Sequence, residues 1–143
     1  MILQHKIAKP PAVVSEYLTD MLKFVSVHPV IHKMDRLNGD DYLVYETLKV
    51  GPFPISFTYP VTVTSSDDRR TVTIRAVAMK VVRIGMTFTI RELPTGTLVD
   101  EEVVFASWLP IKFIMERIFR KQHTRLFENV GNAGVDDSHS SEK

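Results

Sequence analysis

The most regular hydrophobic pattern in the chain lies at residues 53–64, which read FPISFTYPVTVT. Every odd position from Phe53 to Val63 is apolar or aromatic, and every even position is small, polar or proline. This period of two predicts a β-strand with one apolar face. Pro54 and Pro60 fall on the other face. Because proline cannot donate a ladder hydrogen bond, they indicate an edge position or a local bulge.

The same alternation recurs on both sides of this segment. Six or seven successive strands with short polar turns predict an antiparallel meander that packs one face and leaves the other wet. Gly85 lies inside one of them and predicts a bulge or a bend that lets the sheet curl. The other predicted strands of the meander are residues 30–37, 42–50, 71–78, 81–93 and 97–108.

Two short helices are predicted ahead of the meander. Proline is tolerated in the first turn of a helix, so PPAVVSEYL, which begins at Pro10, is predicted to be helical. Thr19 and Asp20 provide a cap-like break before a second short helix, MLKF, and Pro29 ends the region. Residues 2–8, ILQHKIA, predict a strand before both helices.

After the meander the period changes to about 3.6 residues. Apolar side chains recur along one stripe, and Pro110 suits the first turn of a long helix that we expect to reach Val130. Gly131 is placed to cap its end. Residues 132–143 are small, polar and aperiodic, and they predict a flexible C-terminal tail. We therefore expect one domain over residues 1–131.

Composition narrows the class of protein. A chain of 143 residues, 44% hydrophobic and 24% charged, fits one globular domain. The lack of cysteine removes disulfides and thiolate zinc sites and favours a reducing compartment. There is no signal-peptide pattern and no apolar run near the ~20 residues that span a bilayer, so we expect a soluble cytoplasmic protein. A formal net charge of +1 gives the whole chain no bias toward nucleic acid or an anionic membrane.

The order of these elements resembles a known architecture. KPPAVVSEYLTDMLKFVSVHPVI is similar to the opening helix pair of the helix-grip fold, GTLVDEEVVFAS to its last strand, and the run from Trp108 to Val130 to its gripping helix. The chain thus resembles the START, Bet v 1 and polyketide cyclase-like (SRPBCC) superfamily over about residues 1–130. The resemblance implies an α+β fold in which a curved antiparallel β-sheet of six to seven strands wraps around a long C-terminal helix. It also implies a cavity for an apolar small molecule.

Acidic residues in the last predicted strand supply a candidate site. If the odd face of TLVDEEVVFAS is inside, Glu101 goes with it, and if the even face is inside, Asp100 and Glu102 do. The odd face buries fewer charges and more bulk, so Glu101 is expected to point inward. There it would bind a ligand hydroxyl or amine, or act as a general base. The alternative is a carboxylate at the end of the sheet, solvated or salt-bridged.

Aromatic and methionine side chains form the expected apolar wall of the cavity, because ligand sites are mostly apolar with a few placed polar groups. Tyr59 is the second expected polar anchor. Ordinary core packing is the alternative for each member. The expected wall residues are Tyr45, Phe57, Tyr59, Met86, Phe88, Met115 and Phe119.

Metal and cofactor motifs are not found. His28 and His32 are four residues apart, but Pro29 separates them, and four residues of a strand span about 13 Å, too far for one ion. No phosphate-cradling glycine loop, GxSxG elbow or cysteine nucleophile is present. We therefore expect no metal and no cofactor.

Basic residues of the long helix are expected to form a solvated face, with a partner surface or anionic lipid headgroups as the alternative. Exposed aromatic residues that stack bases are not evident beside them, which argues against nucleic acid as a partner of this helix. The residues are Lys112, Arg117, Arg120, Lys121, His123 and Arg125.

Three functions are compatible with the sequence. The first is binding or transport of a lipid- or polyketide-like molecule, with Glu101 and Tyr59 as anchors. The second is an enzyme similar to polyketide cyclases and dehydratases, in which a cavity acid and a tyrosine move protons. The third is a co-chaperone-like protein-interaction module. Whether a reaction is catalysed and whether the chain forms a homodimer are left open by the sequence.

Overall fold

The computed structural model describes residues 1–78, 80–108 and 110–141. Over these ranges the chain forms one antiparallel sheet of seven strands in the order β1-β7-β6-β5-β4-β3-β2. The predicted meander is confirmed, and β1 adds to its free edge beside β7. The elements are β1 (Ile2–Ile7), α1 (Pro11–Thr19), α2 (Met21–Val27), β2 (Ile31–Asn38), β3 (Asp41–Val50), β4 (Phe53–Ser65), β5 (Thr71–Ala78), β6 (Val82–Leu93), β7 (Gly96–Ser107) and α3 (Lys112–Ser141).

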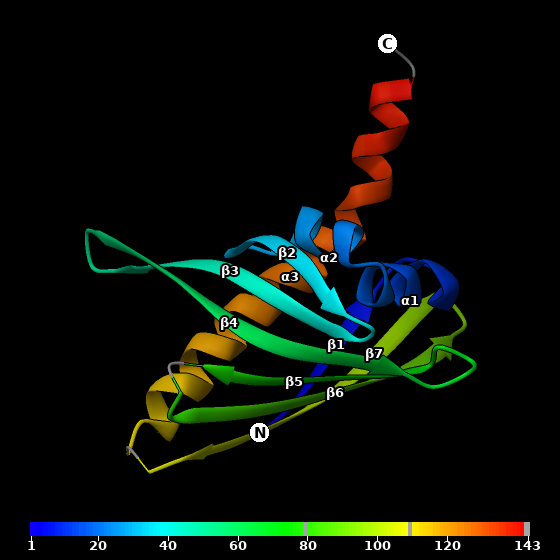
Figure 1. Cartoon of the computed structure of the whole chain (residues 1–143). Coiled ribbons are helices and arrows are strands. Elements are labelled where there is room, and N and C mark those ends of the chain that lie inside the picture. The colour runs from blue at the N-terminus through cyan, green and yellow to red at the C-terminus, as the bar shows by residue number, and fades with distance from the viewer. Residues whose placement is uncertain (79, 109, 142–143) are drawn as a thin grey trace.

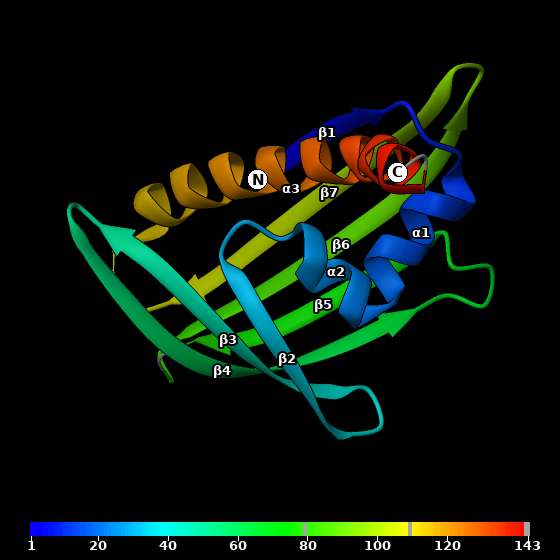
Figure 2. The same cartoon turned by 90° about the horizontal axis from the view of Figure 1, so that it is seen from above.

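The sheet is curved, and α3 lies along its concave side while α1 and α2 cover one end (Figure 1 and Figure 2). This arrangement is the helix-grip fold expected from the element order. Side chains from the inner face of the sheet and from all three helices meet in one core, whose most deeply buried members include Val14, Leu18, Val72, Phe88, Val99, Val103, Leu126 and Val130.

The break between the two short helices is confirmed. Asp20 is the N-cap of α2, and its Oδ1 accepts hydrogen bonds from the backbone N–H of Leu22 (3.0 Å) and Lys23 (3.3 Å). These bonds satisfy two donors that the helix start would otherwise leave unpaired. The chain can therefore turn between α1 and α2 without a loop.

The apolar face of β4 divides into a buried part and an exposed part. Val61 and Val63 are buried in the core, whereas Phe53 is 69% exposed and Ile55 is 44% exposed. The reason is that β4 runs past the end of β5, which pairs only with residues 61–65, so residues 53–60 pair with β3 alone. The prolines therefore lie where β4 has one free side, as expected. The expectation that the whole apolar face is covered is wrong for Phe53 and Ile55.

The structure contradicts the cap expected at Gly131 and the bulge expected at Gly85. The long helix begins at Lys112 rather than Pro110 and continues through Gly131 to Ser141. The φ angle of Gly131 is not positive, so this residue does not adopt the left-handed conformation that ends a helix. Gly85 pairs regularly with Arg75 and Val104, without a register shift. Flexibility of residues 132–143 stays a prediction, and residues 142–143 lie outside the described ranges.

Candidate functional site

A buried carboxylate joins three elements of the fold. Glu101 on β7 is 0% exposed, as the alternation of its strand predicted. His5 on β1 approaches it with Nε2 3.0 Å from Oε1, and His123 on α3 contacts Oε2 through Nδ1. His5 stacks on Phe127 (centroids 4.3 Å apart), and His123 meets the ring of Phe119 edge-on (5.0 Å). These ring contacts fix the two imidazoles around the carboxylate.

The ionisation of Glu101 is governed by its two partners. Burial alone would raise the pKa of this carboxyl group, but the hydrogen bonds and charges of His123 and His5 hold the pKa below its ordinary value. Glu101 is therefore a carboxylate in the interior. The structure supports the inward acid, since Glu101 is buried and bound to two histidines rather than solvated at the end of the sheet.

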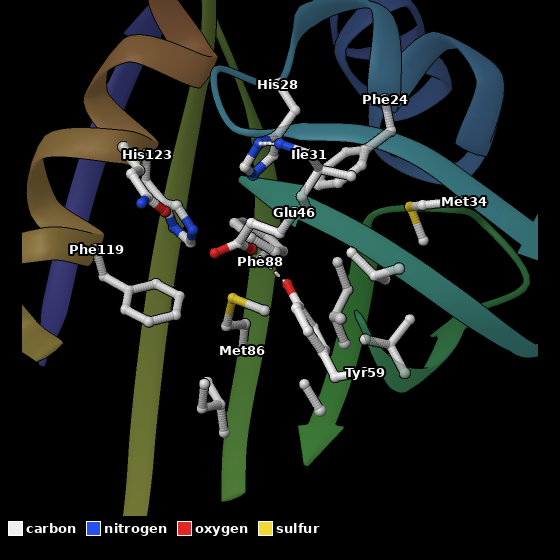
Figure 3. A pocket seen from close by; sticks show the side chains of 16 residues that line it. Phe24, His28, Ile31, Met34, Glu46, Tyr59, Met86, Phe88, Phe119 and His123 are labelled. Atoms are coloured by element: carbon white, nitrogen blue, oxygen red, sulfur yellow. Dashed lines mark hydrogen bonds between the residues drawn. The ribbon is translucent and has the colours of Figure 1, made fainter. Parts of the chain in front are cut away.

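A cavity lies between the sheet, α2 and α3 (Figure 3). Its volume is about 40 Å³, room for about two or three water molecules, whereas pockets for drug-sized ligands occupy roughly 300 Å³ or more. Side chains must move before a larger molecule can enter. The lining is mostly apolar and consists of Phe24, His28, Ile31, Met34, Val44, Glu46, Tyr59, Val61, Ile74, Ala76, Ile84, Met86, Phe88, Phe119, Gln122 and His123.

Glu46 and Tyr59 form an acid–phenol pair inside this cavity. The phenol of Tyr59 donates to Oε1 of Glu46 over 2.6 Å. Burial raises the pKa of Glu46, and the hydrogen bond from Tyr59 only partly opposes this effect. Burial and the neighbouring Glu46 also raise the pKa of Tyr59, so it stays a phenol. The cavity thus contains a carboxyl group that accepts a proton more readily than an ordinary glutamate.

Two histidines face the same space (Figure 3). Nδ1 of His28 accepts the backbone N–H of Val30 (3.2 Å) and Ile31 (3.0 Å), so Nε2 carries the proton of the neutral ring. Burial, and secondly the charge of His123, lower the pKa of His28 to about 3. His123 lines the cavity while its Nδ1 is bound to Glu101. It therefore connects the buried carboxylate to the cavity, and the hydrogen bond to Glu101 orients its ring.

Acidification is expected to destabilise the protein through His28. Its folded-state pKa of about 3 lies below the ordinary 6.5, so the unfolded chain binds the extra proton. The stabilisation is complete above pH 6.5 and is lost as the pH falls toward 3, at no more than about 1.4 kcal/mol per pH unit. Urea unfolding at pH 7.5 and at pH 5 should differ by about 2 kcal/mol. His28→Asn still accepts the backbone bonds but does not titrate, and an unchanged pH slope in this variant would contradict the assignment.

The structure places the residues predicted for the site in three groups. Tyr59, Met86, Phe88 and Phe119 line the cavity. Glu101 lies behind His123 instead of lining the cavity. Three predicted wall residues are half-buried and lie outside the lining. Tyr45 faces the ring of His32, Phe57 stacks on Tyr59, and Met115 packs at the edge of the core.

Sequence reasoning missed four titratable residues of the site, His5, Glu46, His28 and His123. His5 lies on the same inner face of β1 as buried Leu3 and Ile7, and His123 stands four residues after Phe119 on the apolar stripe of α3. Both signals were available in the sequence. The placement of His123 on a solvated face is wrong, since it is 3% exposed.

The fold and the cavity define the class of protein, an SRPBCC helix-grip protein with an internal cavity. A family model described as polyketide cyclase / dehydrase and lipid transport matches residues 3–131, and the chain belongs to this family. Membership supports hydrophobic ligand binding or cyclase activity in general terms. No curated protein matches the chain.

Solved structures share the fold at low sequence identity. Ara h 8.0201 superposes with a TM-score of 0.76 and 11% identity, covering 95% of this chain and 97% of that chain. A START superfamily protein from Mycobacterium smegmatis gives 0.74 and 12%, covering 93% and 94%. Zhui aromatase/cyclase from Streptomyces sp. R1128 gives 0.68 and 14%, covering 93% and 91%. Identities this low establish the fold alone.

Within the described ranges, none of the helices combines the length and the hydropathy needed to cross a bilayer. Over the same residues, no group of three or more histidine, aspartate or glutamate side chains is arranged to hold a metal ion.

Proposed function

We propose that this protein binds a small apolar or amphipathic molecule between the sheet and α3. The observation that carries the proposal is the acid–phenol pair of Glu46 and Tyr59 in an otherwise apolar cavity. Apolar walls supply affinity, and a few placed polar groups orient the ligand. Met86, Phe88 and Phe119 would contact its apolar part, while Glu101 would act through His123.

A ligand would enter most readily where the first turns of α3 move outward. Leu126, Phe127 and Val130 hold the later part of α3 in the core, whereas Phe113 and Ile114 are exposed and Met115 is half-buried. Segments with few buried apolar contacts open at the lowest free-energy cost. The cavity therefore expands most readily at the start of α3. The lipid- or polyketide-like character of the ligand and a cytoplasmic location stay predictions.

Native mass spectrometry of freshly purified protein, followed by organic extraction, tests the proposal. A stoichiometric apolar adduct is expected. Glu46→Gln and Tyr59→Phe should each weaken its retention about tenfold, because each removes a polar contact worth about 1 kcal/mol or more. Tyr45→Phe is the matched control, since Tyr45 does not line the cavity. Full retention in both cavity variants would remove the pair from the site.

A second candidate is an acid–base enzyme, which the Glu101–His123 contact favours. A histidine oriented by a buried carboxylate is a suitable general base, and Glu46, with its raised pKa, is a suitable acid in the same cavity. If the extracted molecule is a substrate, His123→Gln should abolish its turnover while the protein still binds it. If turnover is unchanged in this variant, His123 is not the base.

A further inference from the structure

Large apolar side chains are exposed at one end of the molecule. Phe53 is 69% exposed, Trp108 77% and Phe113 79%, and Ile55 and Ile114 are exposed beside them in the sequence. We call these five residues the exposed apolar end. Folding leaves these five residues in contact with water, and where such residues form a patch they mark an interaction surface.

Strand register brings these residues to the same end. The β3–β4 hairpin turns at the pair Val50 and Phe53, and β6 begins at Val82, which pairs with both Ala78 and Ser107. The start of β4, the end of β7 and the start of α3 therefore lie at one end of the sheet, at the left in Figure 1. Three segments that are far apart in sequence contribute to this surface.

Charge at this end differs from that of the whole chain. Residues 47–57, 77–78, 80–84, 104–108 and 110–117 contain five cations and a single acid, Glu116, which pairs with Lys112 over 4.0 Å. The whole chain is nearly balanced, with 18 cations and 17 acids, so the remainder carries an excess of acids. The exposed cations of this end are Lys49, Lys80, Arg83, Lys112 and Arg117.

The combination of aromatic, aliphatic and basic side chains matches one partner in particular. Tryptophan and phenylalanine insert at the boundary between headgroups and acyl chains, and nearby lysine and arginine attract anionic lipids. A protein partner would match the apolar side chains, but protein surfaces in general do not carry the negative charge that attracts the surrounding cations. We propose that the exposed apolar end docks on the surface of an anionic phospholipid bilayer.

Docking at this end would place the cavity next to the membrane. The lining residues Ala76 and Ile84 directly adjoin Val77 and Arg83, and Phe119 lies on α3 within two turns of Phe113. Membrane contact would therefore act on the same helix start that must move for the cavity to expand. The docking proposal does not depend on the identity of the ligand or on its retention.

Vesicle binding tests the proposal on the full chain. The protein should co-sediment with vesicles of equimolar phosphatidylcholine and phosphatidylglycerol, more weakly at high salt and with vesicles of phosphatidylcholine alone. Trp108 is the chain's single tryptophan, so its emission should shift to the blue as it leaves water. Neutralising Lys49, Arg83 and Arg117 together to glutamine should lower partitioning about 100-fold, at about 1 kcal/mol per charge. The matched charge control neutralises Lys6, Arg36 and Arg125, which are exposed elsewhere.

A second pair of variants tests the apolar contribution. Phe113→Ser should lower partitioning at least about tenfold, whereas Leu22→Ser, at an 84% exposed leucine on α2, should not. Absence of binding to the anionic vesicles, or undiminished binding of the triple variant, would overturn the proposal. So would a concentration-dependent dimer that Phe113→Ser dissociates, since the surface would then belong to a second copy of the chain.

Discussion

Glu101→Ala is expected to lower the free energy of unfolding by about 3–5 kcal/mol, because each buried donor left without its acceptor costs about 1–3 kcal/mol and the missing side chain leaves a void. The substitution leaves His5 and His123 without their shared acceptor in the interior and creates a void between β1, β7 and α3. Because small domains are stable by only about 5–15 kcal/mol, a loss of this size is a large fraction of the total. Urea unfolding at neutral pH measures it.

Glu101→Gln separates the charge from the volume. Its amide fills the same space and still accepts from one imidazole while donating to the other in its neutral form, so the loss should be smaller than for alanine. Asp100→Ala, on the solvent side of the same strand, is the control and should change stability by less than about 1 kcal/mol. If Glu101→Ala cost no more than this control, the carboxylate would not hold the three elements together.

Phe88→Ala is expected to destabilise the protein by about 3–5 kcal/mol and to enlarge the cavity. Phe88 is 1% exposed, and its ring lies 5.9 Å from that of Phe127 and 6.1 Å from that of His123, measured between centroids. Removing it deletes a large buried surface that the surrounding sheet cannot recover by collapsing. Chemical denaturation gives the stability change, and binding of a small apolar probe such as benzene reports the new space.

An exposed phenylalanine provides the control for this experiment. Phe113→Ala should change stability by less than about 0.5 kcal/mol, because Phe113 is mostly in water already. A small loss in Phe88→Ala, close to that of Phe113→Ala, would mean that Phe88 does not pack as the structure places it. Failure of the enlarged cavity to take up the apolar probe would show that the walls collapse around the missing ring.

The fold could be predicted because its hydrophobic periods are simple. Alternation over long strands, a change to helical spacing near residue 110 and proline at the start of α1 are local patterns. The ends of elements were harder to predict, because the same residue can fit either the end or the interior of a helix. Gly131 can end a helix but does not force it to end, and in this chain α3 keeps its helical conformation through that position.

The site could be predicted only in part. Glu101 was found because one of the two possible inner faces of β7 contains a single acid. In β3, apolar residues occur on both faces, so the alternation does not indicate which face is buried. In β3 the sequence favoured Tyr45, while the structure turns Val44 and Glu46 inward. The contact between His5 and Glu101 joins residues 96 positions apart, and no local pattern contains that information. The small volume of the cavity likewise results from the way side chains pack, which the spacing of apolar residues does not reveal.

The pairing of β1 with β7 has a consequence for synthesis of the protein. Among the described residues, β1 pairs with residues 97–102 of β7, and His123, which also contacts Glu101, lies later in the sequence. During translation, the inner face of β1, including Leu3 and Ile7, stays unpaired until residues 97–102 have emerged. Long-range pairing of this kind slows folding and exposes unpaired edges in the meantime. We therefore expect the nascent chain to depend on protection from aggregation until α3 has left the ribosome.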